Sequence, residues 1–149
     1  PFNAWIFSKS LETLSIRMEK HSESALKLAE YLQQHPEVES TKYPFLPSHP
    51  QYELARKQMK MGGGIVVFTI KGGFDRAKKF LDRLQMCSLS ANLGDTRTIA
   101  THPASTTHSK LSEEERQAVG INAGLIRIST GLEHVDDIIA DLGQAFTSS

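Results

Sequence analysis

The stretch that most constrains the fold is "IVVFTI", residues 65–70, a nearly continuous apolar run that is rich in β-branched residues. So short a run is typical of a strand that lies inside a sheet, with side chains buried on both faces. Glycines at 62–64 precede it, and Gly72 and Gly73 follow it, which predicts a turn at its far end. The sequence therefore predicts a sheet in which this strand is central.

Helical patterns surround this strand. From Ser10 to His35, apolar residues recur at steps of three, four or seven, which predicts one long amphipathic helix that ends at Pro36. Further strands are expected at 38–43 and 86–90, and further helices at about 48–59 with Ser48 as cap, at 74–84, after the capping-box pair Ser112 and Glu115, and at 135–146.

This order of elements lacks the evenly repeated units of a doubly wound fold. We therefore predict an α+β fold with a small, mostly antiparallel sheet that helices cover on one side. Residues 1–35 are expected to form a linking helix, and residues 36–149 a small domain.

The stretch "AGLIRIST", residues 123–130, is a predicted strand with an arginine at its centre. Arg127 shares one face of this strand with Leu125 and Ser129, and the isoleucines between them point to the other face. We expect the guanidinium to lie among core neighbours, and its charge then requires an anionic partner. That partner is either a protein carboxylate or the carboxylate of a small molecule, which arginine can bind through two parallel hydrogen bonds.

Residues 91–111 form a polar connection with no clear period, which is long for a compact domain and points to a function. Asn92 and Thr107 lie in it, and their amide and hydroxyl groups could complete the hydrogen bonds of an anion held by Arg127.

Three other features have structural interpretations. His21 interrupts the apolar seam of the long helix and is expected to find a hydrogen bond there. The glycines at 62–64 lead into a strand with no GK[ST] sequence after them, so they predict a turn and not a phosphate-binding loop. Lys42 has no visible source of the desolvation that a reactive lysine needs.

His102 and His108 flank "PAST", but zinc sites use three or four ligands, and no further ligand completes a known spacing. We therefore expect no metal site. Cys87 lies in a predicted strand and is expected to act as a small buried apolar residue.

Composition gives no sign of a polymeric partner. Lysine and arginine number 17, as do aspartate and glutamate, so neither a nucleic acid nor a membrane surface is an expected partner. A single cysteine, with no signal peptide and no long apolar run, favours the cytoplasm. The start "PFNAW" resembles a segment of a longer chain.

Long segments of the sequence resemble one enzyme family. They are "SLETLSIRMEKHSESALKLAEYL" at 10–32, "SHPQYELARKQM", "GGGIVVFTIKGG", and the stretch from "NLGDTRT" at 92 to "IADL" at 142. Together they are similar to the linking helix and the C-terminal domain of the pyridoxal-phosphate enzymes of cysteine and methionine metabolism, which have the fold-type I architecture. The combination "HPASTTH", "LSEEE" and "GLIRISTGLE" is most similar to the O-acetylhomoserine sulfhydrylases. Cystathionine γ-synthase, O-succinylhomoserine sulfhydrylase and methionine γ-lyase are the alternatives.

The resemblance implies roles for the candidate site residues. Arg127 would bind the α-carboxylate of an amino-acid substrate, Asn92 would assist it, and Thr107 would line the pocket. Many members of the family have serine where this chain has Asn92, and the sulfhydrylases often have asparagine.

The resemblance also implies a cofactor, pyridoxal phosphate, bound by a domain upstream of Pro1. Lys42 does not match the family's Schiff-base lysine, so this fragment is expected to be inactive alone. The full-length enzyme would be a homotetramer that converts O-acetylhomoserine and sulfide to homocysteine and acetate. Two other classes stay open: a stand-alone regulatory domain that binds an amino acid, and a structural module for subunit assembly.

Overall fold

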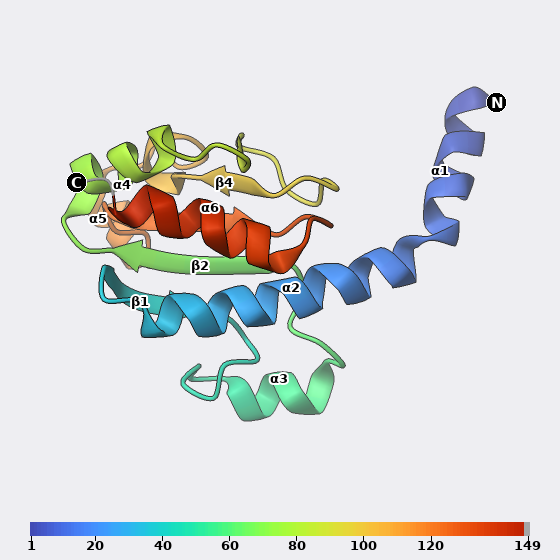
Figure 1. Ribbon diagram of the computed structural model, residues 1–149, viewed down its shortest axis with the longest axis horizontal. Helices are drawn as coiled ribbons and strands as arrows, with labels where there is room; N and C mark the ends of the chain where they lie inside the picture. Colours follow the sequence, from blue (N-terminus) through green and yellow to red (C-terminus); the bar gives the residue numbers. More distant parts are fainter. Residues whose placement is uncertain (148–149) are drawn as a thin grey trace.

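The computed structural model describes residues 1–147, which form one five-stranded sheet with helices packed against it (Figure 1). In chain order the elements are α1 (Phe2–Glu12), α2 (Leu14–Gln34), β1 (Val38–Lys42), α3 (Tyr52–Gln58), β2 (Ile65–Ile70), α4 (Gly73–Asp82), β3 (Ser88–Leu89), β4 (Ile99–Thr101), the 3-10 turn η1 (Pro103–Ser105), α5 (Glu113–Ala118), β5 (Leu125–Ser129) and α6 (Val135–Thr147). The strand order is β1-β2-β5-β4-β3, and only the β3–β4 pair is parallel. The predicted α+β class is therefore confirmed.

The core lies between the sheet and the helices α2, α4 and α6. Alternate residues of the inner strands β2 and β5, such as Phe68 and Ile126, are buried on this side. The helices contribute Leu28 and Leu32 of α2, Ala77 and Phe80 of α4, and Ile138, Leu142 and Phe146 of α6. The run at 65–70 is an interior strand as predicted, although β5 is the middle one. The residues of β2 and β5 that alternate with these buried residues face the opposite side of the sheet. The candidate site lies on that side.

The long N-terminal helix is interrupted, contrary to the prediction of one helix from Ser10 to His35. Thr13 leaves helical geometry, with φ −107° and ψ 4°. Its hydroxyl donates to the Ser10 carbonyl at 3.4 Å, and the Arg17 side chain donates to the same carbonyl at 2.8 Å. These side-chain bonds compete with the backbone ladder and separate α1 from α2.

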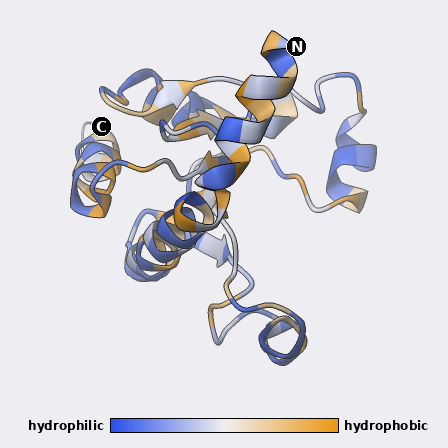
Figure 2. Ribbon diagram, turned by 90° about the vertical axis from the view of Figure 1, so that its right-hand side faces the viewer, coloured by the Kyte–Doolittle hydropathy of each residue, from blue (hydrophilic) through white to orange (hydrophobic). Residues whose placement is uncertain are grey.

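The helix α1 buries none of its residues. It projects away from the sheet (Figure 1), and Figure 2 shows apolar residues along it. Large apolar side chains of this helix, such as Trp5 and Phe7, are exposed. The helix α2 is different, because from His21 onward it packs on β1, β2 and α6. The division of the chain at residue 35 stays a prediction.

The helix α3 begins at Tyr52, later than the predicted start at Ser48. The reason is that the Ser48 hydroxyl does not cap it. Instead, this hydroxyl accepts a hydrogen bond from the Gln33 side-chain amide of α2 at 2.8 Å. By contrast, the predicted capping box of α5 is present, with Ser112 and Glu115 each bonding the backbone of the other.

Residues 91–111 are not entirely a loop, and this part of the prediction is wrong. Residues 99–101 form β4, which is buried and pairs with β5 on one side and β3 on the other. A strand of three residues is too short to show an alternation in the sequence. The predicted strand at 86–90 is also shorter, since only Ser88–Leu89 pairs.

A buried carboxylate fixes the segment before β3. Asp141 of α6 accepts hydrogen bonds from the backbone N–H groups of Gln85, Met86 and Cys87 at 2.8, 3.1 and 2.9 Å.

Within residues 1–147, no helix has the length and apolar character that crossing a membrane requires.

Candidate functional site

Arg127 lies on the face of the sheet that is turned away from α2, α4 and α6. It pairs directly with Val67 of β2 and with Thr101 of β4, and paired residues point to the same face. Its neighbours in sequence, Ile126 and Ile128, are fully buried in the helical core. Its neighbours on this face, Leu125 and Ser129, are buried as expected, but Arg127 itself is only half-buried.

The guanidinium of Arg127 has only neutral partners among residues 1–147. Its Nη2 donates to the backbone oxygens of Ala91 and Asn92 at 3.2 and 2.9 Å, and lies 3.5 Å from the Thr101 hydroxyl. Within the described chain, no carboxylate lies close enough to form an ion pair with it. Its Nε is buried and has no hydrogen-bond partner there. One edge of the guanidinium is thus held by the protein while a buried donor is left unused.

Arg127 lines a cavity of about 270 Å³. The other lining residues come from the sheet and from the segment that lies over it: Lys42, Val67, Pro103, Thr107, His108, Val119, Gly120, Ile121 and Leu125. Thr107, predicted as a site residue, is therefore beside the same cavity as Arg127. Its hydroxyl is hydrogen-bonded to Nδ1 of His108 at 2.8 Å.

Asn92 reaches Arg127 through its backbone and not through its side chain. Its carbonyl oxygen accepts from Arg127, and its side-chain Oδ1 accepts from the backbone N–H of Leu93 at 2.9 Å. The structure thus brings Arg127, Asn92 and Thr107 into one neighbourhood. Their substrate-binding roles stay a prediction.

Glu133 anchors the loop that carries Asn92. Its carboxylate accepts from the backbone N–H of Thr98 at 2.6 Å and from the Thr98 hydroxyl at 2.8 Å. At Gly131 a Cβ would lie 2.5 Å from backbone atoms of Thr96 and Arg97, so only glycine fits between the two segments. The residues after β5 therefore hold the loop that supplies carbonyl oxygens to Arg127.

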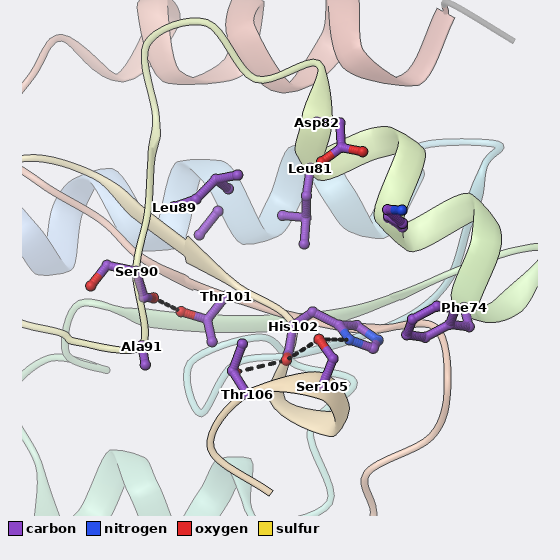
Figure 3. A pocket seen from close by; sticks show the side chains of 12 residues that line it. Phe74, Leu81, Asp82, Leu89, Ser90, Ala91, Thr101, His102, Ser105 and Thr106 are labelled. Atoms are coloured by element: carbon purple, nitrogen blue, oxygen red, sulfur yellow. Dashed lines mark hydrogen bonds between the residues drawn. The ribbon is translucent and has the colours of Figure 1, made fainter. Parts of the chain in front are cut away.

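A second, larger cavity of about 410 Å³ lies between α4, β4 and η1 (Figure 3). Phe74, Leu81 and Leu89 project toward it, and His102 lies at one end with its ring edge-on to Phe74. Both His102 ring nitrogens are already used, in bonds of 2.9 Å to the Ser105 hydroxyl and the Ala123 carbonyl. The surface of this cavity is mostly apolar, and the cavity is not our candidate site.

The structural interpretations of His21 and the glycines are confirmed. His21 is buried, and its Nδ1 lies 2.6 Å from the Thr130 carbonyl. The segment at 62–64 is irregular chain before β2, and the Tyr43 ring fills the space beside it, with its hydroxyl donating to the Gly63 carbonyl at 2.9 Å. No group of three potential metal ligands occurs among residues 1–147.

Cys87 is buried, as predicted. Burial raises the pKa of its thiol well above the ordinary value, and the neighbouring Asp141 carboxylate raises this pKa further. The thiol is therefore protonated and poorly reactive.

Sequence reasoning missed two parts of the site. Thr101 was assigned to a loop, because β4 is too short to show a pattern. Lys42 was judged only as a possible Schiff-base lysine, although it lines the Arg127 cavity. The signal for Lys42 lies in the pairing of β1 with β2, which places it opposite Val67 and which the sequence does not reveal.

The sequence and the fold were then compared with known proteins. A model of the family described as Cys/Met metabolism PLP-dependent enzymes matches residues 1–147. An L-methionine gamma-lyase of Porphyromonas gingivalis and an O-succinylhomoserine sulfhydrylase of Pseudomonas aeruginosa are each 51% identical over 148 residues, which is 99% of this chain and 37% of theirs. An O-acetyl-L-homoserine sulfhydrylase of Leptospira meyeri is 50% identical over 147 residues, which is 97% of this chain and 33% of its own.

Among solved structures, a putative O-acetylhomoserine (thiol)-lyase of Campylobacter jejuni superposes with a TM-score of 0.95 at 45% identity, and the match covers 99% of this chain and 35% of that one. That protein carries N'-pyridoxyl-lysine-5'-monophosphate at position 205. This chain spans about 37% of the length of the methionine gamma-lyase and the O-succinylhomoserine sulfhydrylase named above. The match over the whole described chain and the agreement in fold show that it belongs to the pyridoxal-phosphate-dependent enzymes of cysteine and methionine metabolism.

Proposed function

We propose that the full-length enzyme containing this chain catalyses γ-replacement on O-acetylhomoserine, with Arg127 binding the α-carboxylate of the substrate. Sulfide would form a bond to Cγ while the Cγ–O bond breaks, and acetate would leave with the electron pair to give homocysteine. Relatives of about 50% identity include sulfhydrylases for acetyl and succinyl esters as well as methionine lyases.

The observation that carries this proposal is the incomplete set of partners around Arg127. A half-buried guanidinium whose Nη2 is held by carbonyl oxygens still needs an anion, since burying an unpaired charge is costly. Arg127 lines a cavity, its buried Nε has no hydrogen-bond partner among the described residues, and none of their carboxylates forms an ion pair with it. A small-molecule carboxylate supplies the missing charge and accepts two parallel hydrogen bonds.

The carbonyl oxygens of Ala91 and Asn92 give the guanidinium its orientation. A carboxylate bound to the remaining donors would in turn be fixed, and with it the position of the substrate's Cα. Well-oriented binding of this kind can lower a reaction barrier by several kcal/mol. Thr107 would add a hydroxyl at the cavity wall, and Asn92 would add its side-chain amide group.

The cofactor of the family is pyridoxal phosphate, which acts as an electron sink in amino-acid chemistry. The glycine-rich segment at 62–64 does not supply a place for its phosphate. This segment is packed against Tyr43, and a Cβ at Gly62 would meet that ring at 2.5 Å. We propose that another part of the full-length enzyme holds the cofactor, that the 149-residue chain alone does not turn over, and that the enzyme is a cytoplasmic homotetramer.

The test is Arg127→Lys in the full-length enzyme, with Arg56→Lys on the exposed surface of α3 as the matched control. Lysine keeps the charge but loses the planar fork, and one charge-assisted hydrogen bond contributes about 1.5–3 kcal/mol. We therefore expect kcat/KM for O-acetylhomoserine to fall by about 10- to 100-fold, because a tenfold change corresponds to about 1.4 kcal/mol. An unchanged kcat/KM in the Arg127 variant would refute the assignment.

A further inference from the structure

The segment 90–94 supplies the two carbonyl oxygens that hold the guanidinium of the site, and hydroxyl groups of the sheet fix both of its ends. At one end, the Thr101 hydroxyl donates to the carbonyl oxygen of Ser90 (Figure 3). At the other end, the Ser129 hydroxyl accepts from the backbone N–H of Gly94 at 3.0 Å. The segment is therefore tied to the sheet on either side of the carbonyl oxygens that it presents.

Both hydroxyls belong to residues beside Arg127. Thr101 of β4 pairs directly with Arg127, and Ser129 lies two residues further along β5, so the three side chains point to the same face. Thr101 and Ser129 are 3% and 2% exposed. Water cannot easily replace the partners of hydroxyls that are so deeply buried, so these two bonds keep the segment in one place.

The Thr101 hydroxyl also connects the segment with the guanidinium. Because it donates its hydrogen to Ser90, its lone pairs are left for Nη2 of Arg127, which lies 3.5 Å away. The same Nη2 donates to the carbonyl oxygens of Ala91 and Asn92 at 3.2 and 2.9 Å. A shift of the segment would move both of these acceptors, and with them the orientation of the guanidinium.

We propose that Thr101 and Ser129 are positioning residues for the carboxylate-binding arginine. The inference rests on the proposed function, because it takes Arg127 as the partner of the substrate's α-carboxylate. Neither hydroxyl needs to touch the substrate. Without either one, the guanidinium has the orientation that binds a carboxylate for only a fraction of the time, and the apparent affinity for the substrate falls by that fraction.

The kinetic test uses Ser129→Ala and Thr101→Val in the full-length enzyme. In each variant we expect KM for O-acetylhomoserine to rise by about threefold to tenfold, which is the effect of one hydrogen bond, and kcat to fall by less than about threefold. KM for sulfide should not change, because sulfide has no carboxylate. A purely structural role would lower kcat through loss of folded enzyme and would leave both KM values unchanged.

Two further variants serve as rescue and control. Thr101→Ser keeps the hydroxyl and should keep KM for O-acetylhomoserine within about twofold of the wild-type value. Thr69→Val is the matched control. Thr69 of β2 is a buried threonine on the same face of the sheet, since it pairs with Leu125, and its hydroxyl accepts from the Asn122 side-chain amide at 3.0 Å. Its removal should leave both KM values unchanged.

A double variant tests whether the hydroxyls act through the arginine. In an Arg127→Lys background, Ser129→Ala should change KM for O-acetylhomoserine by less than about 1.5-fold, because the group that it positions is already absent. An undiminished effect in this background would contradict the inference.

Hydrogen exchange provides a readout that does not depend on turnover. In the full-length enzyme, Ser129→Ala should speed the exchange of the Gly94 amide by at least about fivefold, as followed by mass spectrometry of peptides that cover 90–94. Peptides of β2 should stay protected, which shows that the variant is folded. Thr69→Val should leave the exchange of 90–94 unchanged.

The outcomes separate the two proposals. A fall in kcat/KM in Arg127→Lys, together with unchanged KM for O-acetylhomoserine in Ser129→Ala and Thr101→Val, overturns the inference and leaves the proposed function intact. An unchanged kcat/KM in Arg127→Lys overturns the proposed function and the inference with it. Unchanged exchange of 90–94 in Ser129→Ala overturns the inference whatever the kinetics show.

Discussion

The buried carboxylate of Asp141 allows a quantitative prediction for stability. It accepts three backbone hydrogen bonds from residues 85–87, and its side chain is almost fully buried, at 7% exposure. In Asp141→Asn, one oxygen is replaced by an NH₂ group, which can only donate. At least one backbone N–H then loses its acceptor, and the remaining bonds lose the assistance of the charge.

An unsatisfied buried donor costs about 1–3 kcal/mol, and charge-assisted bonds are stronger than neutral ones by roughly 1 kcal/mol. We therefore expect Asp141→Asn to lower the free energy of unfolding by about 2–4 kcal/mol at pH 7. For a domain of this size each 1 kcal/mol corresponds to about 2–4 °C, so Tm should fall by about 5–15 °C. Urea unfolding followed by circular dichroism measures the first value, and a thermal scan measures the second.

The dependence on pH gives a further check. Burial raises the pKa of Asp141, but the backbone hydrogen bonds lower it by more, so the folded-state pKa lies below the ordinary value of 3.8. A carboxyl with a lowered pKa stabilises the fold above its unfolded-state pKa, and this contribution is lost as the pH falls through the folded-state pKa. The difference between wild type and Asp141→Asn should therefore be complete at pH 7 and shrink on approach to pH 3.

Asp82→Asn is the matched control, because Asp82 is exposed at the end of α4 and makes no ion pair with the described residues. Its effect should stay within about 0.5 kcal/mol. A loss below 1 kcal/mol in Asp141→Asn, or a loss that is the same at pH 3 and pH 7, would show that the carboxylate does not hold this segment as we describe.

Two other predictions follow from local geometry. Gly131→Ala should destabilise the chain by about 2 kcal/mol or more, since its Cβ would meet backbone atoms of Thr96 and Arg97 that cannot move freely; urea unfolding measures this, and a neutral result would contradict the close approach. Cys87 should react with iodoacetamide at pH 8 far more slowly in the folded chain than in urea, because burial raises its pKa and blocks access; equal rates would mean that the thiol is accessible.

Local patterns were sufficient for several elements of the fold. The capping box of α5 is a contact between residues three apart in the chain, so the sequence contains all of it. The strand β5 and the helix α6 show clear periods of two and 3.6 residues. The break at Thr13 was not predicted because hydroxyl and arginine side chains must outcompete the backbone ladder there.

The candidate site was predictable only in part. Arg127 is recognisable because a charge in an apolar strand requires an explanation. The actual partners of Arg127 are backbone oxygens, which any residue type supplies, and they are placed by Glu133 from beyond β5. The contribution of Lys42 depends on the register of three strands that are distant in sequence.

The alternation along β5 has a consequence for folding accuracy. If β5 paired with β2 one residue out of register, every side chain would change face. Arg127 would then point into the layer beneath α2 and α6, and Ile126 and Ile128 would be exposed to water. Burying an unpaired guanidinium costs several kcal/mol, so the misaligned sheet is strongly disfavoured. The arginine that we propose binds the substrate therefore also favours the correct register between β5 and β2.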